Sequence, residues 1–264
     1  MEVFYFTTAQ YAINNLALRR LKVARYRDLN DPFELRAVSI DDAVTQKAFD
    51  SKNTEIDESE GLICFTAEWR NPLMWSHYAD KHKGVALAFE VPDTELHEVH
   101  YQRRLTAPPK GSGSDEMERL FKRLRIAKFE DWQYEEEHRQ FFQLKSLHGE
   151  DGLYFVPFGE NLKLTQVMLG PRCSLQPGTL GALVQPIDGS IRITQTKIAA
   201  QGFEIVNAAS STAAVLTMSN FGAQQRVVNR RRKKRSSNSL FSGDLGRALQ
   251  AFSQSNAAKP GSGA

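Results

Sequence analysis

The stretch GLICFTAEWRNPLMWSHYADKHKGVALAFEV, residues 61–91, decides the fold that the sequence predicts. It contains two short apolar runs, residues 62–65 and 85–89, each of the length expected for a strand that is buried on both faces. The residues between them predict a helix, because Asn71 is a favourable N-cap and Pro72 falls at the first helical position. We therefore expect a strand, a helix and a strand in succession, with the rest of the chain packed around them.

The predicted helix ends at Gly84, which suits the left-handed conformation of a C-terminal stop. The side of this helix that carries Trp75, His77 and Tyr78 is unusually aromatic and polar for a helix that only fills a core. Trp75, His77 and Tyr78 on this helix are suited to line a pocket, where they offer an indole N–H, an imidazole and a hydroxyl group to a ligand. In the alternative interpretation, Trp75 and Tyr78 anchor the helix to the sheet and His77 has no special role.

The composition is ordinary for a soluble globular protein, since 41% of the 264 residues are hydrophobic, 25% charged and 10% aromatic. The chain suits one large domain, or one domain with an extension. Its two cysteines are too few for a disulfide scaffold or a structural zinc site, and we expect a reducing, cytoplasmic location. The sequence contains no run of about eighteen apolar residues, so we expect no membrane association.

We expect a single α+β domain over residues 1–206 and a low-complexity, weakly ordered tail over residues 207–264. The net charge of +3 is unevenly placed, because the tail carries a dense basic run. This run contains Arg230, Arg231, Arg232, Lys233, Lys234 and Arg235. Such a run is typical of a nucleic-acid contact, and equally of a solubilising extension.

Three further segments have a clear local signal. Residues 28–34 contain Asn30 followed by Asp31 and Pro32, which predicts either a site-bearing loop or a plain solvent-exposed turn. Residues 50–60 are acidic and poor in apolar residues, which predicts a mobile loop. Residues 107–114, rich in Pro, Gly and Ser, predict a flexible linker.

The second half of the domain begins with an amphipathic helix predicted at residues 115–129. Its outer face is basic and includes Lys128, which is typical of a solvated surface or of a contact with phosphate. Short strands are then predicted at residues 152–158, 162–169, 180–184, 191–193 and 203–206. A P-loop, a Rossmann glycine fingerprint, metal-ligand spacings such as HExxH and a nucleophile elbow do not occur in the sequence.

Period two in residues 132–142 predicts a strand with a charged face. That face consists of Glu135, Glu137 and Arg139. Two carboxylates and a guanidinium on one side of a strand form a charge-compensated cluster, which keeps a glutamate ionised at a site. The alternative is the start of a helix with surface glutamates.

Five motifs in this chain resemble a bacterial family that is catalogued only as a domain of unknown function. They are YFT at 5–7, NDPFE at 30–34, MWSHYA at 74–79 followed by Lys83 and Gly84, YExExR at 134–139 and LGPR at 169–172. In order and spacing they cover residues 3–206, and the resemblance says nothing about the tail. That family has no established activity to carry over to this chain.

The layout is also similar to ADP-ribosyltransferases that modify nucleic acids. Their opening strand, their helix with Asn-Leu and their second strand resemble residues 5–7, 15–16 and 21–23, and their Glu-x-Glu resembles Glu135 and Glu137. The chain departs from that pattern because neither His nor Arg stands at the first-strand position. The resemblance implies an α/β (α+β) fold with a strand-rich core of two small sheets and flanking helices.

The same resemblance implies that NAD is the substrate, held in a cleft between the two sheets. Glu137 would stabilise the oxocarbenium-like ribose as the glycosidic bond breaks, with Glu135 and His77 as further catalytic residues. The NAD-binding residues would be Tyr5, Thr7, Arg25, Asn30, Asp31, Trp75, Tyr78 and Arg139. The ADP-ribose would pass to a nucleic acid or a protein, which suits a toxin or an anti-phage effector whose partner is an antitoxin or another regulatory protein.

Two other classes of function fit the same residues. In a non-catalytic nucleic-acid-binding or interaction module, Glu135, Glu137 and Arg139 form a structural ion-pair cluster. In a metal-dependent nuclease, Asp31, Glu34 and Glu137 would hold a divalent metal ion. The ADP-ribosyltransferase hypothesis instead requires Glu137 and the aromatic helix to face one cavity.

Overall fold

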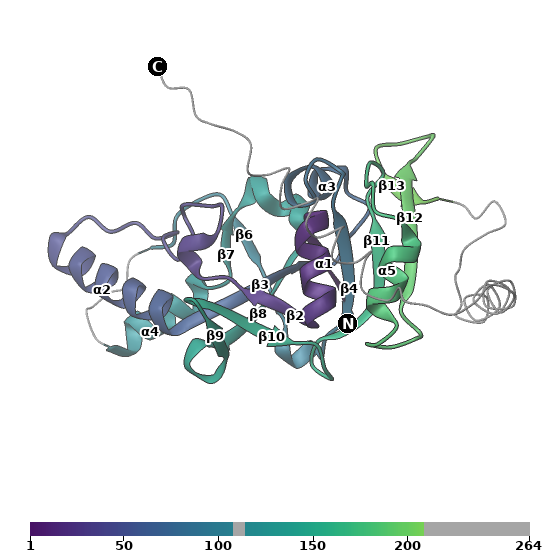
Figure 1. Ribbon diagram of the computed structural model, residues 1–264. Helices are drawn as coiled ribbons and strands as arrows, with labels where there is room; N and C mark the ends of the chain where they lie inside the picture. The colour runs from purple at the N-terminus through teal and green to yellow at the C-terminus, as the bar shows by residue number, and fades with distance from the viewer. Residues whose placement is uncertain (108–113, 209–264) are drawn as a thin grey trace, which may run out of the picture. The chain divides into compact units, whose positions relative to one another are not determined.

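The computed structural model describes residues 1–107 and 114–208. The basic run of the predicted tail and most of the predicted linker therefore lie outside the described residues. Within them, helices pack around a strand-rich core in a mixed α/β arrangement, as expected (Figure 1). None of the described helices is long and apolar enough to cross a bilayer.

The chain alternates between strands and helices. The strands are β1 (Glu2–Thr7), β2 (Arg20–Val23), β3 (Glu60–Thr66), β4 (Val85–Glu90), β5 (His97–Glu98), β6 (His100–Gln102), β7 (Ala127–Phe129), β8 (Glu137–Gln143), β9 (His148–Glu150), β10 (Leu153–Pro157), β11 (Lys163–Leu169), β12 (Arg192–Ile198) and β13 (Ile205–Asn207). The helices are α1 (Ala9–Leu18), α2 (Ala43–Ser59), α3 (Pro72–Tyr78), α4 (Ser114–Leu124) and α5 (Pro177–Val184), with short 3-10 turns that include η1 (Tyr26–Asp28) and η3 (Glu130–Glu135).

The largest sheet has eight strands in the order β13-β12-β11-β4-β1-β3-β8-β5. The sheet is weakly joined between β1 and β3, where the register consists of the one pair Phe4–Thr66. On its other side, β1 pairs with β4 along its whole length. The strands β1 and β3 therefore diverge. A three-stranded sheet, β2-β10-β9, and a two-stranded sheet, β6-β7, complete the described strands. This arrangement differs from the predicted core of two small sheets.

Strand β4 is buried on both faces, as its apolar run predicts. Val85 and Leu87 belong to the core cluster that also contains the inner faces of α1 and α5. Ala86 and Ala88, on the opposite face of β4, pack in a second cluster with Trp75 of α3. The small alanine side chains leave room for the indole, so α3 lies close against the sheet.

Helix α3 begins as predicted and ends earlier than predicted. The side chain of Asn71 caps it by accepting a hydrogen bond from the N–H of Leu73 at 2.9 Å, and Pro72 occupies the first turn. The helix stops at Tyr78, because residues 80–82 all adopt positive φ angles, of 44°, 54° and 72°. Lys81 and His82, which fall inside the helix that the sequence predicts up to Gly84, are therefore in a left-handed loop.

Gly84 is needed for a close approach and not for a left-handed stop. A Cβ atom at Gly84 would lie 2.1 Å from the carbonyl oxygen of Thr7, and one at Gly170 would lie 2.4 Å from the carbonyl oxygen of His82. The N–H of Gly170 donates to the carbonyl oxygen of Gly84 at 3.0 Å. These two glycines let the loop after α3 pack against the ends of β1 and β11.

The prediction of a loop at residues 50–60 is wrong, because residues 50–59 form the second half of α2 and Glu60 begins β3. The inner face of α2 contains Phe49, Asn53, Ile56 and Asp57. Asp57 is tolerated in this buried position because it accepts hydrogen bonds from the backbone N–H and the guanidinium of Arg27. Phe49 stacks on Phe121 with 5.0 Å between ring centroids, which joins α2 to α4.

The strand predicted at residues 180–184 is also wrong. These residues belong to α5, in which Pro177 occupies the first turn. Leu180 and Val184 are buried four residues apart, on the face that packs against the core shared with α1. A spacing of four on one buried face is the helical pattern.

We predict that Gly84→Ala lowers the free energy of unfolding by about 1–3 kcal/mol, because the added methyl group meets backbone atoms that have no room to move. The measurement is urea denaturation followed by circular dichroism. Gly178→Ala is the matched control, since a Cβ atom in that first turn of α5 meets nothing within 4 Å and should leave stability unchanged or slightly higher. Equal stability of the two variants would contradict the role assigned to Gly84.

Candidate active site

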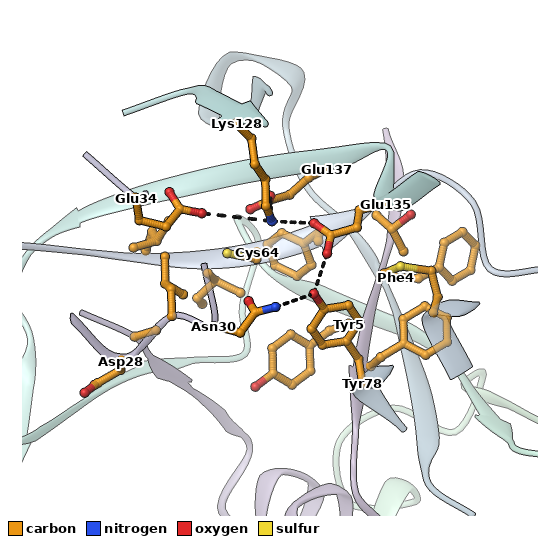
Figure 2. Close-up of a pocket in the computed structure, with 18 of the residues that line it drawn as sticks. Phe4, Tyr5, Asp28, Asn30, Glu34, Cys64, Tyr78, Lys128, Glu135 and Glu137 are labelled. Atoms are coloured by element: carbon orange, nitrogen blue, oxygen red, sulfur yellow. Dashed lines mark hydrogen bonds and ion pairs between the residues drawn. The ribbon is translucent and has the colours of Figure 1, made fainter. Parts of the chain in front are cut away.

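A cavity of about 290 Å³ lies where β1 and β3 diverge (Figure 2). Part of its lining is aromatic and comes from Phe4, Tyr5, Phe6 and Phe65. Another part is polar or charged and comes from Asn30, Glu34, Tyr78, Lys128, Glu135 and Glu137. An apolar hollow with a few convergent polar groups is the usual form of a small-molecule site.

The charged side of the cavity is built on Arg139 of β8, which is fully buried. Two of its N–H donors bind Glu137 at 2.7 and 3.1 Å, and two bind Glu34 at 2.6 and 2.8 Å. The fifth donates to the carbonyl oxygen of Arg125 at 2.9 Å. All five donors of the guanidinium are therefore satisfied, and the loop that carries Glu34 is tied to β8.

The ammonium group of Lys128 lies among three carboxylates. It donates to Glu137 at 2.8 Å and to Glu135, and it lies 3.9 Å from the nearest oxygen of Glu34. Burial would lower the pKa of Lys128, but Glu137 and Glu135 outweigh burial and raise it. The ammonium group therefore stays charged at neutral pH.

A chain of hydrogen bonds runs from this buried ammonium group to the surface (Figure 2). Lys128 donates to one oxygen of Glu135, and the hydroxyl group of Tyr78 donates to the other. The side-chain amide of Asn30, which is exposed, donates to the Tyr78 hydroxyl oxygen at 3.1 Å. The chain links the loop after β2, helix α3 and turn η3 along one side of the cavity.

Glu34, Glu135 and Glu137 share two cations, Arg139 and Lys128, and the pKa values of the three carboxyl groups shift in different directions. Burial raises the pKa of Glu135, and Lys128 offsets only part of the rise. Burial likewise raises the pKa of Glu34 more than Arg139 lowers it. In Glu137 burial acts in the same direction, but Arg139 and Lys128 outweigh it and bring the pKa to about 2. Two carboxyl groups with different protonation behaviour in one site are suited to separate roles.

Three uncharged lining groups keep their protons. Burial raises the pKa of Tyr5 to about 12, and burial together with Glu135 raises the pKa of Tyr78 further. Burial also raises the pKa of the Cys64 thiol well above its usual value. Cys64 is therefore a protonated thiol, and it is not a ready thiolate nucleophile.

The structure brings five of the predicted site residues to this cavity. They are Tyr5, Asn30, Tyr78, Glu135 and Glu137. Glu137 and Arg139 share a face of β8, as predicted, but Glu135 lies in turn η3 and not on the strand. Glu136 between them adopts a left-handed conformation with φ of 43°, and the two carboxylates meet through Lys128 instead.

Trp75 and Arg139 do not face the cavity, which corrects the ligand contacts expected of them. The Trp75 side chain is fully buried, its ring packs edge-on against Phe6 with 4.9 Å between centroids, and its N–H donates to the carbonyl oxygen of Trp69 at 2.6 Å. Arg139 is equally buried and has no donor left for a pyrophosphate. Both residues hold the walls of the site together.

Four further predicted residues also lie away from the cavity lining. Thr7 is buried at the end of β1, and Asp31 is buried in its loop, where it accepts a hydrogen bond from the N–H of Phe33 at 2.9 Å. Arg25 lies over the ring of Tyr154, at 5.5 Å from its centroid. The last of the four is His77, which is exposed, with its ring 6.0 Å from that of Tyr134.

Lys128 is the site residue that the sequence interpretation missed. It was expected on the outer face of a helix at residues 115–129, but α4 ends at Leu124 and Lys128 lies in β7. A signal was present, because Lys128 is the lone charged residue in the run Ile126-Ala127-Lys128-Phe129. A lysine in such an apolar run is expected to be buried with a carboxylate partner.

The three acids proposed for a metal-dependent nuclease do not converge. Glu34 and Glu137 are paired with Arg139, whereas Asp31 is turned to Phe33 in its own loop. Among residues 1–107 and 114–208, no group of three or more His, Cys, Asp or Glu is arranged to hold a metal ion. The ammonium group of Lys128 already occupies the space between the carboxylates that line the cavity.

Comparisons with known proteins identify no relative: no family model, no curated protein and no solved structure matches the chain.

We predict that Arg139→Met lowers the free energy of unfolding by about 3–5 kcal/mol at pH 7, because Glu34 and Glu137 lose their shared partner in a buried site. The pKa of Glu137 in the folded state, about 2, lies below its ordinary 4.5. Glu137 therefore stabilises the wild type above pH 4.5, and this contribution is lost as the pH falls through about 2. The difference between wild type and variant should accordingly shrink as the pH falls from 7 toward 3.

Urea denaturation at several pH values measures this difference. The control is Arg103→Met, because the pair that Arg103 forms with Glu130 is exposed at the surface and its loss should leave stability nearly unchanged. Similar stability of the two variants at pH 7 would contradict the central role of Arg139.

Proposed function

We propose that this chain is an ADP-ribosyltransferase-like enzyme that cleaves the N-glycosidic bond of NAD and transfers ADP-ribose to an acceptor. One observation carries the proposal. The carboxyl group of Glu135 lines an aromatic cavity, and its two oxygens are fixed by Tyr78 and Lys128. A buried, oriented carboxylate beside aromatic rings is what the cleavage of a bond between a ribose and a pyridine base requires.

The size and charge of the cavity fit the nicotinamide riboside part of NAD. Its volume of about 290 Å³ is near the lower end of the roughly 300–1,000 Å³ found for small-molecule sites, so the rest of the dinucleotide would remain outside. The nicotinamide ring of NAD is a cation, which suits a site with three carboxyl groups and two cations. Lys22, half-exposed in the lining and 3.8 Å from Asp28, replaces Arg25 and Arg139 as the candidate contact for the pyrophosphate.

The structure favours Glu135 over Glu137 as the reacting carboxylate. Glu137 already accepts hydrogen bonds from Arg139 and Lys128, and these two cations balance its negative charge. Glu135 would stabilise the positive charge that develops on the ribose as the bond from C1′ to the nicotinamide nitrogen breaks. As the acceptor then forms its bond to C1′, its proton would pass to Glu135, whose raised pKa makes it the stronger base of the two.

The acceptor in this proposal is a group on a nucleic acid or on a protein, as the resemblance implies. Such an activity suits a toxin or an anti-phage effector that a regulatory protein restrains. The second candidate is a non-catalytic interaction module, which is favoured by the complete pairing of Arg139, since that pairing alone would hold loop and sheet together.

We predict that Glu135→Gln slows the release of nicotinamide from NAD by about 100-fold or more, because an amide neither carries the negative charge nor accepts the proton. Chromatography of reactions that contain DNA, RNA or protein acceptors in separate tubes measures the release, with and without a chelator. The control is Glu160→Gln, an exposed glutamate between β10 and β11 that should leave the rate unchanged. Circular dichroism establishes that both variants are folded.

The outcomes separate the three classes of function. Chelator-resistant release that Glu135→Gln abolishes supports the proposal. Nucleic-acid cleavage that a chelator stops would favour the nuclease, and a folded wild type without turnover on any acceptor would favour the interaction module. Full activity in Glu135→Gln would overturn the mechanism.

A further inference from the structure

The ammonium group of Lys128 occupies a position that carboxylate-rich sites often give to a divalent cation. It lies between Glu135 and Glu137, and it is near Glu34. We propose that Lys128 is a positioning residue, whose fixed ammonium group keeps the carboxyl group of Glu135 ionised and oriented toward Tyr78 and the cavity. The inference deepens the proposed function and rests on it for the catalytic consequence.

The ammonium group has little freedom to leave this position. The Lys128 side chain is 4% exposed, and its charged end lies 5.2 Å from the centre of the Trp132 ring. Its backbone lies in β7, which pairs with β6 in register Tyr101 to Lys128. Two of its three N–H donors are used on Glu135 and Glu137, so any movement would break two buried charged hydrogen bonds.

Among residues 1–107 and 114–208, Lys128 is also the cation that contacts Glu135 directly. Arg139 donates all its N–H groups to Glu34, Glu137 and a backbone carbonyl group. The other groups that face Glu135 are Tyr78 from α3, Glu137 from β8, Tyr101 from β6 and the neighbouring Tyr134. The three tyrosines are neutral and Glu137 is an anion. Without Lys128, Glu135 would face neutral groups and a like charge in a buried site, which favours its protonated form.

The consequence for catalysis has a definite sign. The proposed reaction needs Glu135 ionised, so activity is lost as the pH falls through the pKa of Glu135. Removal of the ammonium group raises that pKa further, because an opposite charge in contact lowers the pKa of a carboxyl group by about 1–3 pH units. The acidic limb of the rate profile of a Lys128→Met variant should therefore move upward by a similar amount. On that limb, the rate at a given pH falls by about tenfold for each pH unit by which the limb has moved.

Two readouts test the inference on the full chain. The first is the pH profile of nicotinamide release in wild type, Lys128→Met and Lys128→Arg, in which the arginine variant should restore most of the wild-type profile. The second is the carbon-13 NMR titration of the Glu135 carboxyl group, assigned through its loss in Glu135→Gln. The control is Lys163→Met, which removes an exposed lysine paired with Glu90 and should shift neither readout.

The titration keeps the test independent of the proposed function. If the wild type releases no nicotinamide, the proposed function fails, whereas an upward shift of the Glu135 titration in Lys128→Met still supports the role of Lys128. An unchanged titration in a folded Lys128→Met variant would overturn the inference.

If Lys128→Met does not fold, the nitrogen-15 shift of the Lys128 ammonium group replaces the titration. It should change in Glu135→Gln and not in Glu160→Gln, and an unchanged shift in both would overturn the direct pairing.

Discussion

The site depends on one buried guanidinium group, that of Arg139. A charge taken out of water costs several kcal/mol unless partners surround it, and here every donor has an acceptor. Because those acceptors come from the loop after η1, from β8 itself and from Arg125 just after α4, a single group ties β8 to two other segments. Arg139, to which the sequence assigns a ligand contact, thus holds the walls of the cavity in place.

The three carboxyl groups near Arg139, those of Glu34, Glu135 and Glu137, have different roles. Glu34 and Glu137 are paired with Arg139, whereas Glu135, which also lines the cavity, makes no contact with that guanidinium group. Lys128 supplies the remaining positive charge from inside the protein. A site that carries its own cation has its electrostatics fixed before a ligand arrives, which is the form of preorganisation that stabilises charge in a transition state.

The sequence predicts the features that are determined locally. The N-cap of α3 and the apolar runs on either side of the helix give the central unit, and the two-residue spacing places Glu137 and Arg139 on one face of β8. It fails where a distant partner decides the outcome. Asp57 is buried in α2 because Arg27 binds it. Lys128 becomes a site residue because α4 ends before it and because the carboxylates of Glu34, Glu135 and Glu137 surround its ammonium group. The pairing of Asp57 has no signature within a few residues of the chain, and the apolar run around Lys128 indicates a buried partner without identifying it.

The most direct test of this account is a crystal structure of the Glu135→Gln protein soaked with NAD. The account predicts electron density for nicotinamide and its ribose inside the cavity, with the Tyr78 ring beside the ligand and ribose C1′ next to position 135. The account would be contradicted if the cavity held only water while NAD lay elsewhere on the protein or did not bind.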